Sequence, residues 1–227
     1  MNGIAERLAR VRERVDYAAR LAGREPQDVR LVAVSKKAPP EAIREAYEAG
    51  QRLFGENYAQ EFATKSDALA DLTDIEWHFI GHLQSNKARL VAPRARAVHT
   101  VDTGGLAREL ARRVEAAGRA PLDVLIEVNV GGEPQKHGIV ASDLEEVLGQ
   151  VRSFSALSVR GLMTMPPEGD LDTARNVFET LVSLRNLHGG PAELPELSMG
   201  MSGDFEVAIA AGATIVRVGT AIFGARE

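Results

Sequence analysis

Short apolar runs alternate with longer amphipathic stretches from one end of this 227-residue chain to the other. This alternation is typical of repeated strand–helix units, and it disfavours a meander of strands or a helical bundle. Runs such as Val124-Leu125-Ile126 are apolar at successive positions, as expected for parallel strands covered on both faces. The candidate strands are Leu31–Ser35, Arg52–Gly55, Glu76–Gly81, Ala97–Val101, Asp123–Val130, Ser158–Thr164, Glu196–Met199 and Thr214–Val218.

The intervening stretches carry helix signals. Apolar residues recur at helical spacing, and glycine ends most of the periodic segments. Ser142 and Glu145 have the spacing of a capping box. We expect helices over Pro40–Ala49, from near Leu106 to Gly118, after Ser142, from Asp170 or Asp172 to Gly189, and over Asp204–Ala211, plus an N-terminal helix with Ile4, Leu8, Val11, Val15 and Leu21 on one face.

Eight such units in a chain near the usual length of about 250 residues predict a (β/α)₈ TIM-type barrel, an α/β fold. We expect one domain over residues 1–227, with the N-terminal helix as an addition. An open doubly wound sheet is the alternative. The turn Ser35–Pro39 contains no GxGxxG glycines, so it does not support a dinucleotide crevice.

Composition excludes several classes of function. The chain has no cysteine and no HExxH spacing among its five histidines, so we expect no metal site. A net charge of −5 and a pI near 5.6 argue against a nucleic-acid partner. No apolar stretch reaches the roughly 20 residues that span a bilayer. We expect a cytoplasmic monomer without a membrane partner.

Lys36 follows the apolar run Leu31–Ser35, at the point where a buried strand gives way to a loop. A lysine partly stripped of water has a lowered pKa and can form an imine with a carbonyl compound. A solvated lysine on an extended stem is the ordinary alternative.

The loops after the seventh and eighth candidate strands suit an anion, and barrels often hold phosphate there. The first loop, Ser198–Asp204, is rich in glycine and leads into a helix, so its backbone N–H groups, including those of Met201 and Gly203, the helix dipole and the Ser202 hydroxyl are available. The second, Arg217–Thr220, adds a cation, the Gly219 amide and a hydroxyl. Ordinary capping is the alternative for each loop alone.

Strand eight neighbours strand one once the barrel closes, so a single ligand with an aldehyde and a phosphate would reach both sites. Pyridoxal 5′-phosphate fits, with Lys36 as its imine partner. Arg217 would then lie near the pyridine nitrogen. A permanently charged guanidinium disfavours protonation of that nitrogen, which makes the ring a weak electron sink.

The segments LVAVSKK, LFGENYAQE, WHFIGHLQSNK, VLIEVNVGGEPQKHGI, GLMTM, LSMGMSGD and RVGTAIFG span nearly the whole chain. In these segments the chain resembles the pyridoxal phosphate homeostasis protein family. The resemblance implies a barrel similar to the N-terminal domain of alanine racemase, with the cofactor bound to Lys36 as an internal aldimine. It also implies phosphate contacts from Ser202, Gly219 and Thr220, a ring-nitrogen contact from Arg217, and a ring-hydroxyl contact from Asn57.

The family often has Ser-Lys-Thr-Lys-Pro where this chain has Ser35–Pro39, so its second lysine is displaced here. Strand parity predicts that Lys37 faces away from Lys36. Lys136 matches another family lysine, either as a secondary attachment point or as an exposed loop residue. His82 either faces the pocket as a proton carrier or packs at the barrel rim.

We expect a binding protein that serves vitamin B6 homeostasis by holding pyridoxal phosphate as a Schiff base on Lys36 without robust catalysis, with apo forms of cofactor-dependent enzymes as partners. A pyridoxal-phosphate-dependent amino-acid racemase is the alternative, but the tyrosine base of alanine racemase comes from a second domain that we do not expect here. A Schiff-base aldolase that attacks a sugar phosphate directly is the third possibility.

Overall fold

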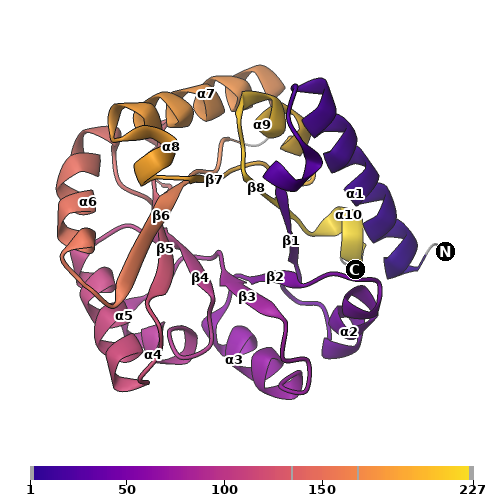
Figure 1. Ribbon diagram of the computed structural model, residues 1–227, viewed down its shortest axis with the longest axis horizontal. Helices are drawn as coiled ribbons and strands as arrows, with labels where there is room; N and C mark the ends of the chain where they lie inside the picture. Colours follow the sequence, from indigo (N-terminus) through magenta and orange to yellow (C-terminus); the bar gives the residue numbers. More distant parts are fainter. Residues whose placement is uncertain (1–2, 134, 168, 225–227) are drawn as a thin grey trace.

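The computed structural model describes residues 3–133, 135–167 and 169–224. Its strands form a closed parallel barrel in chain order, in which β8 returns to pair with β1, so the predicted fold class is confirmed. The helices lie outside the ring of strands (Figure 1). The strands are β1 (Arg30–Val34), β2 (Leu53–Glu56), β3 (Glu76–Phe79), β4 (Ala97–Val101), β5 (Leu122–Glu127), β6 (Leu157–Met163), β7 (Glu196–Ser198) and β8 (Ile215–Val218).

Helices follow most of the strands, as the amphipathic stretches predict. No helix among the described residues is both long enough and apolar enough to cross a membrane. The α-helices are α1 (Ile4–Leu21), α2 (Pro40–Glu48), α3 (Ala59–Ala68), α4 (Ala88–Val91), α5 (Gly104–Ala116), α6 (Leu144–Arg152), α7 (Leu171–Leu187), α8 (Gly190–Glu193), α9 (Phe205–Ala211) and α10 (Thr220–Phe223), and the 3₁₀ helices are η1 (Pro26–Asp28), η2 (Ser85–Lys87) and η3 (Ala141–Asp143).

Strand alternation separates an outer apolar layer from a more polar interior. Trp77 and Phe79 in β3 point outward, since both rings contact the Phe62 ring of α3 at centroid distances of 5.9 Å. His78 lies between them in sequence and therefore points into the barrel. Its ring is buried against His99 of β4. The barrel interior thus contains ionisable groups that need hydrogen-bond partners.

Helix α1 packs against α2, α9 and α10, and so covers the seam where β8 meets β1 (Figure 1). Ile4, Leu8, Val11 and Val15 are buried, as their spacing predicts. The prediction that Leu21 shares this face is wrong, because its side chain is 71% exposed. Leu21 is the last residue of the helix, where Ala18 and Ala19 take the buried positions.

The predicted capping box before α6 is also wrong. The helix begins at Leu144, and its N-cap residue Asp143 has helical dihedral angles and makes no capping hydrogen bond. A 3₁₀ turn over Ala141–Asp143 precedes it, so the chain is already wound where Ser142 would cap. The Ser142 hydroxyl instead donates to Asp143, and Glu145 pairs with His188.

Other helix boundaries agree with their sequence signals. Asp170 caps α7, since its carboxylate accepts from the backbone N–H groups of Asp172 and Thr173. Gly212 ends α9 with a φ of 113°, a conformation that favours glycine. At the end of α7 the Gly189-Gly190-Pro191 turn stops the helix, and a short helix, α8, follows directly.

Candidate functional site

A cavity of about 490 Å³ opens at the C-terminal end of the barrel, within the range of about 300–1,000 Å³ that is usual for small-molecule sites. Its walls come from the ends of β1 and β8 and from the loops after β2, β3, β6 and β7. The lining residues are Val34, Lys36, Asn57, Ile80, Met165, Pro167, Gly169, Asp170, Leu171, Ala174, Met201, Ser202, Gly203, Asp204, Arg217, Gly219 and Thr220.

Strand parity carries Lys36 to this cavity. Val34 lines the cavity, and the next residue, Ser35, turns the other way, where its hydroxyl donates to Glu56 Oε1 at 2.7 Å. Lys36 then returns to the cavity side, where it is half-buried. The lysine is therefore presented by the last residues of a barrel strand.

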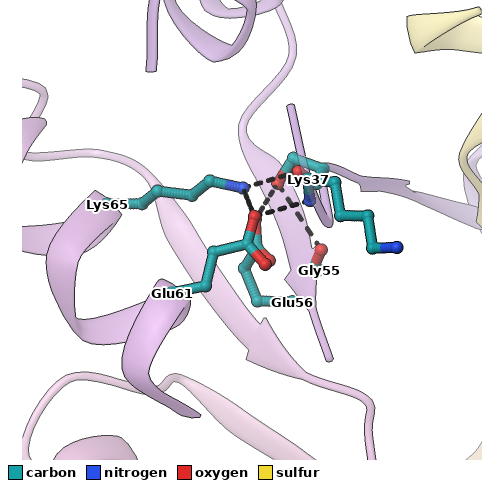
Figure 2. Close-up of polar contacts among 6 residues, drawn as sticks. Lys37, Gly55, Glu56, Glu61 and Lys65 are labelled. Atoms are coloured by element: carbon teal, nitrogen blue, oxygen red, sulfur yellow. Dashed lines mark hydrogen bonds and ion pairs between the residues drawn. The ribbon is translucent and has the colours of Figure 1, made fainter. Parts of the chain in front are cut away.

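A buried ionic network holds the turn that follows Lys36 (Figure 2). Lys65 of α3 donates to Glu56 Oε1 at 2.7 Å, to Glu61 Oε1 at 2.6 Å and to the Ser35 carbonyl at 2.6 Å. The side chains of Lys65 and Glu56 are only 5% and 0% exposed. Burial raises the pKa of Glu56, and the hydrogen bonds from Lys65 and Ser35 oppose that effect.

Lys37 is the one described non-glycine residue with a positive φ, 62°. Its backbone N–H donates to Glu61 Oε1 at 2.5 Å, which holds this left-handed conformation in place. Figure 2 shows its side chain extending away from Glu61 and Lys65. Lys37 does not line the 490 Å³ cavity, but Lys36 and Lys37 both line a smaller cavity. Our prediction that the two side chains face apart relied on strand alternation, and the turn ends that alternation.

The two loops that we expected to bind an anion are joined in the structure. The Ser202 hydroxyl accepts from the Gly219 backbone N–H at 3.4 Å. The N–H groups of Ser202 and Gly203 donate to none of the described residues. Asp204 accepts from the Met201 N–H at 2.5 Å, and burial is the main reason that the pKa of its carboxyl is raised. The loops therefore offer N–H and hydroxyl donors at the cavity.

Arg217 is buried at the floor of the cavity. Its guanidinium donates to Ser198 Oγ at 2.6 Å and to the Thr164 carbonyl at 3.1 Å. Burial lowers its pKa to about 10, an effect that the nearby Glu127 and Asp204 oppose. Arg217 is consequently a fixed cation and donor at neutral pH.

Asn57 follows β2 and contributes an acceptor. Its Oδ1 atom is buried, and it has no hydrogen-bond partner among the described residues. The backbone at Asn57 packs closely against Gly81. A side chain at position 81 would not fit, since its Cβ would lie 2.1 Å from the Asn57 carbonyl oxygen. A buried amide oxygen without a partner is a candidate acceptor for a ligand hydroxyl.

Eight of the ten residues that we predicted for the site line this cavity, namely Lys36, Asn57, Met201, Ser202, Gly203, Arg217, Gly219 and Thr220. His82 and Lys136 do not. Lys136 pairs with Glu133 at 2.6 Å and approaches the carbonyl of Met165, a cavity residue, at 3.4 Å. Its amine therefore lies at the rim.

His82 also lies at the rim, stacked on His137 with ring centroids 3.7 Å apart. Ligand atoms of these two rings and of Asp102 all lie within 4.8 Å of one another, a spacing that allows a metal ion. No signal in the sequence identified this group, because its members come from three different loops. The expectation that the chain has no metal site stays a prediction.

Sequence reasoning missed the loop after β6, which contributes Met165, Pro167, Gly169 and Asp170 to the cavity. The segment GLMTM leads into this loop and was a usable signal. It also missed Glu127 at the end of β5, whose pKa is raised to about 7 by burial and by the nearby Asp102, against the opposing effect of Arg217.

Comparisons with known proteins identify the family of this chain. Residues 7–227 match the family described as "Alanine racemase, N-terminal domain". The pyridoxal phosphate homeostasis protein of Escherichia coli strain K12 is 45% identical over 234 residues, which cover 100% of this chain and 98% of that protein. The chain belongs to the pyridoxal phosphate homeostasis protein family.

Solved structures extend the comparison. PipY of Synechococcus elongatus PCC7942, determined with PLP bound, superposes with a TM-score of 0.83 at 40% identity, over 97% of this chain and 100% of PipY. Alanine racemase from Corynebacterium glutamicum superposes with a TM-score of 0.67 at 18% identity, over 97% of this chain and 61% of the racemase. At that identity the racemase shares the fold alone.

Proposed function

We propose that this protein binds pyridoxal 5′-phosphate as a Schiff base on Lys36 and serves its homeostasis as a carrier without robust catalysis. One observation carries the proposal: a single cavity holds Lys36 together with Ser202, Gly219 and Thr220, although these residues are far apart in sequence. The relatives named for pyridoxal phosphate homeostasis and the PLP-bound structure of PipY support it.

The residues of the cavity fit the chemical groups of this cofactor. When bound, pyridoxal phosphate supplies an aldehyde for the amine and an electron-accepting ring. The N–H groups of Ser202 and Gly203, with the Ser202 and Thr220 hydroxyls, suit the phosphate. The unpartnered Oδ1 of Asn57 suits the ring hydroxyl, and the donor Arg217 suits the ring nitrogen.

Arg217 favours a carrier over a racemase. Its guanidinium stays charged and is held by Ser198 and Thr164, so it would donate to the ring nitrogen of a bound cofactor and would not leave a proton there. A neutral ring nitrogen withdraws electrons weakly. The residues around Arg217 would therefore suit binding of the cofactor more than proton abstraction from an amino acid.

Reductive trapping tests the attachment. Incubation with pyridoxal phosphate should give a yellow protein, and borohydride followed by peptide mass spectrometry should place the label on Lys36. Lys36→Ala should lose the colour and the label. Lys37→Ala, which changes the neighbouring amine outside this cavity, should keep both. A colourless protein, or a label on Lys136 in the unaltered chain, would contradict the proposal.

Optical inversion separates the carrier from the racemase. We expect the loaded protein to leave single-enantiomer amino acids unchanged. Inversion near the median enzyme rate of about 10 per second, lost in Lys36→Ala, would establish the racemase instead. Transfer of the cofactor to apo enzymes, a cytoplasmic location and a monomeric state stay predictions.

A further inference from the structure

A smaller cavity, of about 90 Å³, lies at the opposite, N-terminal end of the barrel. It is formed where the strands begin, and most of its wall is charged. Its polar lining residues are Arg30, His78, Arg96, Asp123, Arg160 and Glu196. It shares no residue with the cavity that holds Lys36, so a ligand in this second cavity would not depend on the proposed function.

The charges around this cavity do not balance. Arg30 pairs with Glu196 at 2.7 Å, and Arg96 pairs with Asp123 at 3.1 Å. Arg160 is exposed and forms no ion pair with any described residue. One positive charge therefore remains, on a residue that lines the cavity.

A hydrogen-bonded chain inside the barrel allows the proton of the neutral His78 ring to be assigned to one of its nitrogens. Arg217 can only donate, so Ser198 Oγ accepts from it at 2.6 Å. Among the described residues the other contact of that hydroxyl is His99 Nδ1 at 2.8 Å. We assign the Ser198 proton to this contact, because a buried hydroxyl needs an acceptor. His99 then carries its own proton on Nε2 and donates it to His78 Nδ1 at 2.8 Å.

His78 consequently carries its proton on Nε2. Burial, with help from Arg30 and Arg96, lowers the pKa of His78 to about 3, and burial lowers the pKa of His99 well below its usual value, so both rings are neutral at pH 7. His78 is only 2% exposed, and its Nε2 has no partner among the described residues. The His78 ring lines the cavity, and its Nδ1 is directed at His99. This buried N–H requires an acceptor.

We propose that the N-terminal cavity binds a small oxyanion of the sulfate or phosphate class, which accepts from His78 Nε2–H and forms an ion pair with Arg160. The volume suits a compact ion, since it equals the space of about three water molecules at roughly 30 Å³ each. Guanidinium groups bind such oxyanions through paired hydrogen bonds. The carboxylates of Asp123 and Glu196 are held by Arg96 and Arg30 at the edge of the same cavity.

Histidine ring NMR during a sulfate titration tests the site, with chloride keeping the ionic strength constant. In protein with isotope-labelled histidine, the His78 Nε2 signal should shift and reach saturation. The signal is assigned with His78→Gln. If that variant does not fold, replacing His82, His137 and His188 with alanine leaves only the buried pair, His78 and His99. Because the signal comes from His78, it reports sulfate in this cavity and not sulfate bound by the loops at the C-terminal end.

Arg160→Gln should weaken the sulfate affinity about tenfold, the equivalent of about 1.4 kcal/mol. The exposed side chain makes this variant safe for folding. Arg108→Gln, which removes an exposed arginine from α5 on the outside of the barrel, should leave the affinity unchanged. No saturable shift would show that water alone satisfies His78. Equal affinity in Arg160→Gln would place the sulfate elsewhere. Either result overturns the proposal.

Discussion

The two ends of the barrel differ in size and in how they treat charge. The C-terminal end holds a cavity of about 490 Å³, and the N-terminal end one of about 90 Å³. At the C-terminal end, loops after the strands build the walls and supply backbone N–H groups. At the N-terminal end, the first residues of the strands supply the walls. One set of strands therefore serves a cofactor-sized site at one end and an ion-sized site at the other.

Ion pairs follow the same division. Behind Lys36, the pair of Lys65 and Glu56 is almost wholly buried. At the N-terminal end, Arg96 is 54% exposed in its pair with Asp123. Buried charges depend on their partners far more than solvated charges do. Loss of one ionic contact should therefore lower the free energy of unfolding strongly at the C-terminal end and only slightly at the N-terminal end.

Replacing Lys65 is the largest test of this difference. Lys65→Met leaves the carboxylates of Glu56 and Glu61 without their cation and releases the Ser35 carbonyl. We expect a loss of about 3–5 kcal/mol in the free energy of unfolding, measured by urea denaturation. Attachment of pyridoxal phosphate to Lys36 should weaken as well, because the turn after Lys36 loses its support.

The matched variant at the other end is Arg96→Gln, which should cost about 1 kcal/mol or less. Lys65→Met combined with Glu56→Gln should recover part of the stability, because a neutral amide tolerates burial better than an uncompensated carboxylate. Equal costs for Lys65→Met and Arg96→Gln would refute the distinction between the two ends.

A change of pH should also have opposite effects on the stability that the two ends contribute. Glu127, at the end of β5, has a pKa raised from 4.5 to about 7. Between these values it ionises only in the unfolded chain, so its contribution to stability falls as pH rises, by about 3 kcal/mol in total. His78 has a pKa lowered from 6.5 to about 3, so its contribution falls as pH drops through that range.

Glu127→Gln should therefore stabilise the protein at pH 7 by up to about 3 kcal/mol and give no gain below pH 4.5. Urea denaturation across this pH range measures both values. In this variant the free energy of unfolding should rise with pH, because the folded protein keeps His78 and His99 neutral. A gain that does not depend on pH would mean that Glu127 is ionised in the folded protein.

The barrel could be predicted from the sequence, because the apolar patterns that specify its strands are local in the chain. Each strand is a short apolar run, and each was placed within three residues of its observed ends. The largest error lies at β5, which we extended to Val130 and which ends at Glu127. Val128 instead forms an isolated bridge to Ile139, and Asn129 binds the loop at Glu133. Residue type alone does not distinguish a strand from such a bridge.

Some residues at and around the site could be predicted from the sequence, and others could not. Lys36 and the loops after β7 and β8 were predictable, because barrel closure brings known strand ends together. Lys65 was not, since a lysine four residues after a glutamate on a helix normally indicates an exposed pair. Only the packing of α3 on the barrel buries it. His78 was within reach, because it alternates with two outward aromatic residues, but its partner His99 depends on the register of β4.

Backbone shape at the C-terminal end gives the smallest expected effect. Gly200 has a φ of 92°, and a Cβ there would lie 2.6 Å from the Ala208 Cβ, so Gly200→Ala should cost about 2 kcal/mol. Gly203 lies in the same loop with no positive φ and no atom within 4 Å of an added Cβ. Gly203→Ala should change the free energy of unfolding by less than about 0.5 kcal/mol. If the two variants were equally stable in urea, the loop would owe its shape to Asp204 and its bond to Met201, and the backbone conformation at Gly200 would be incidental to the cavity.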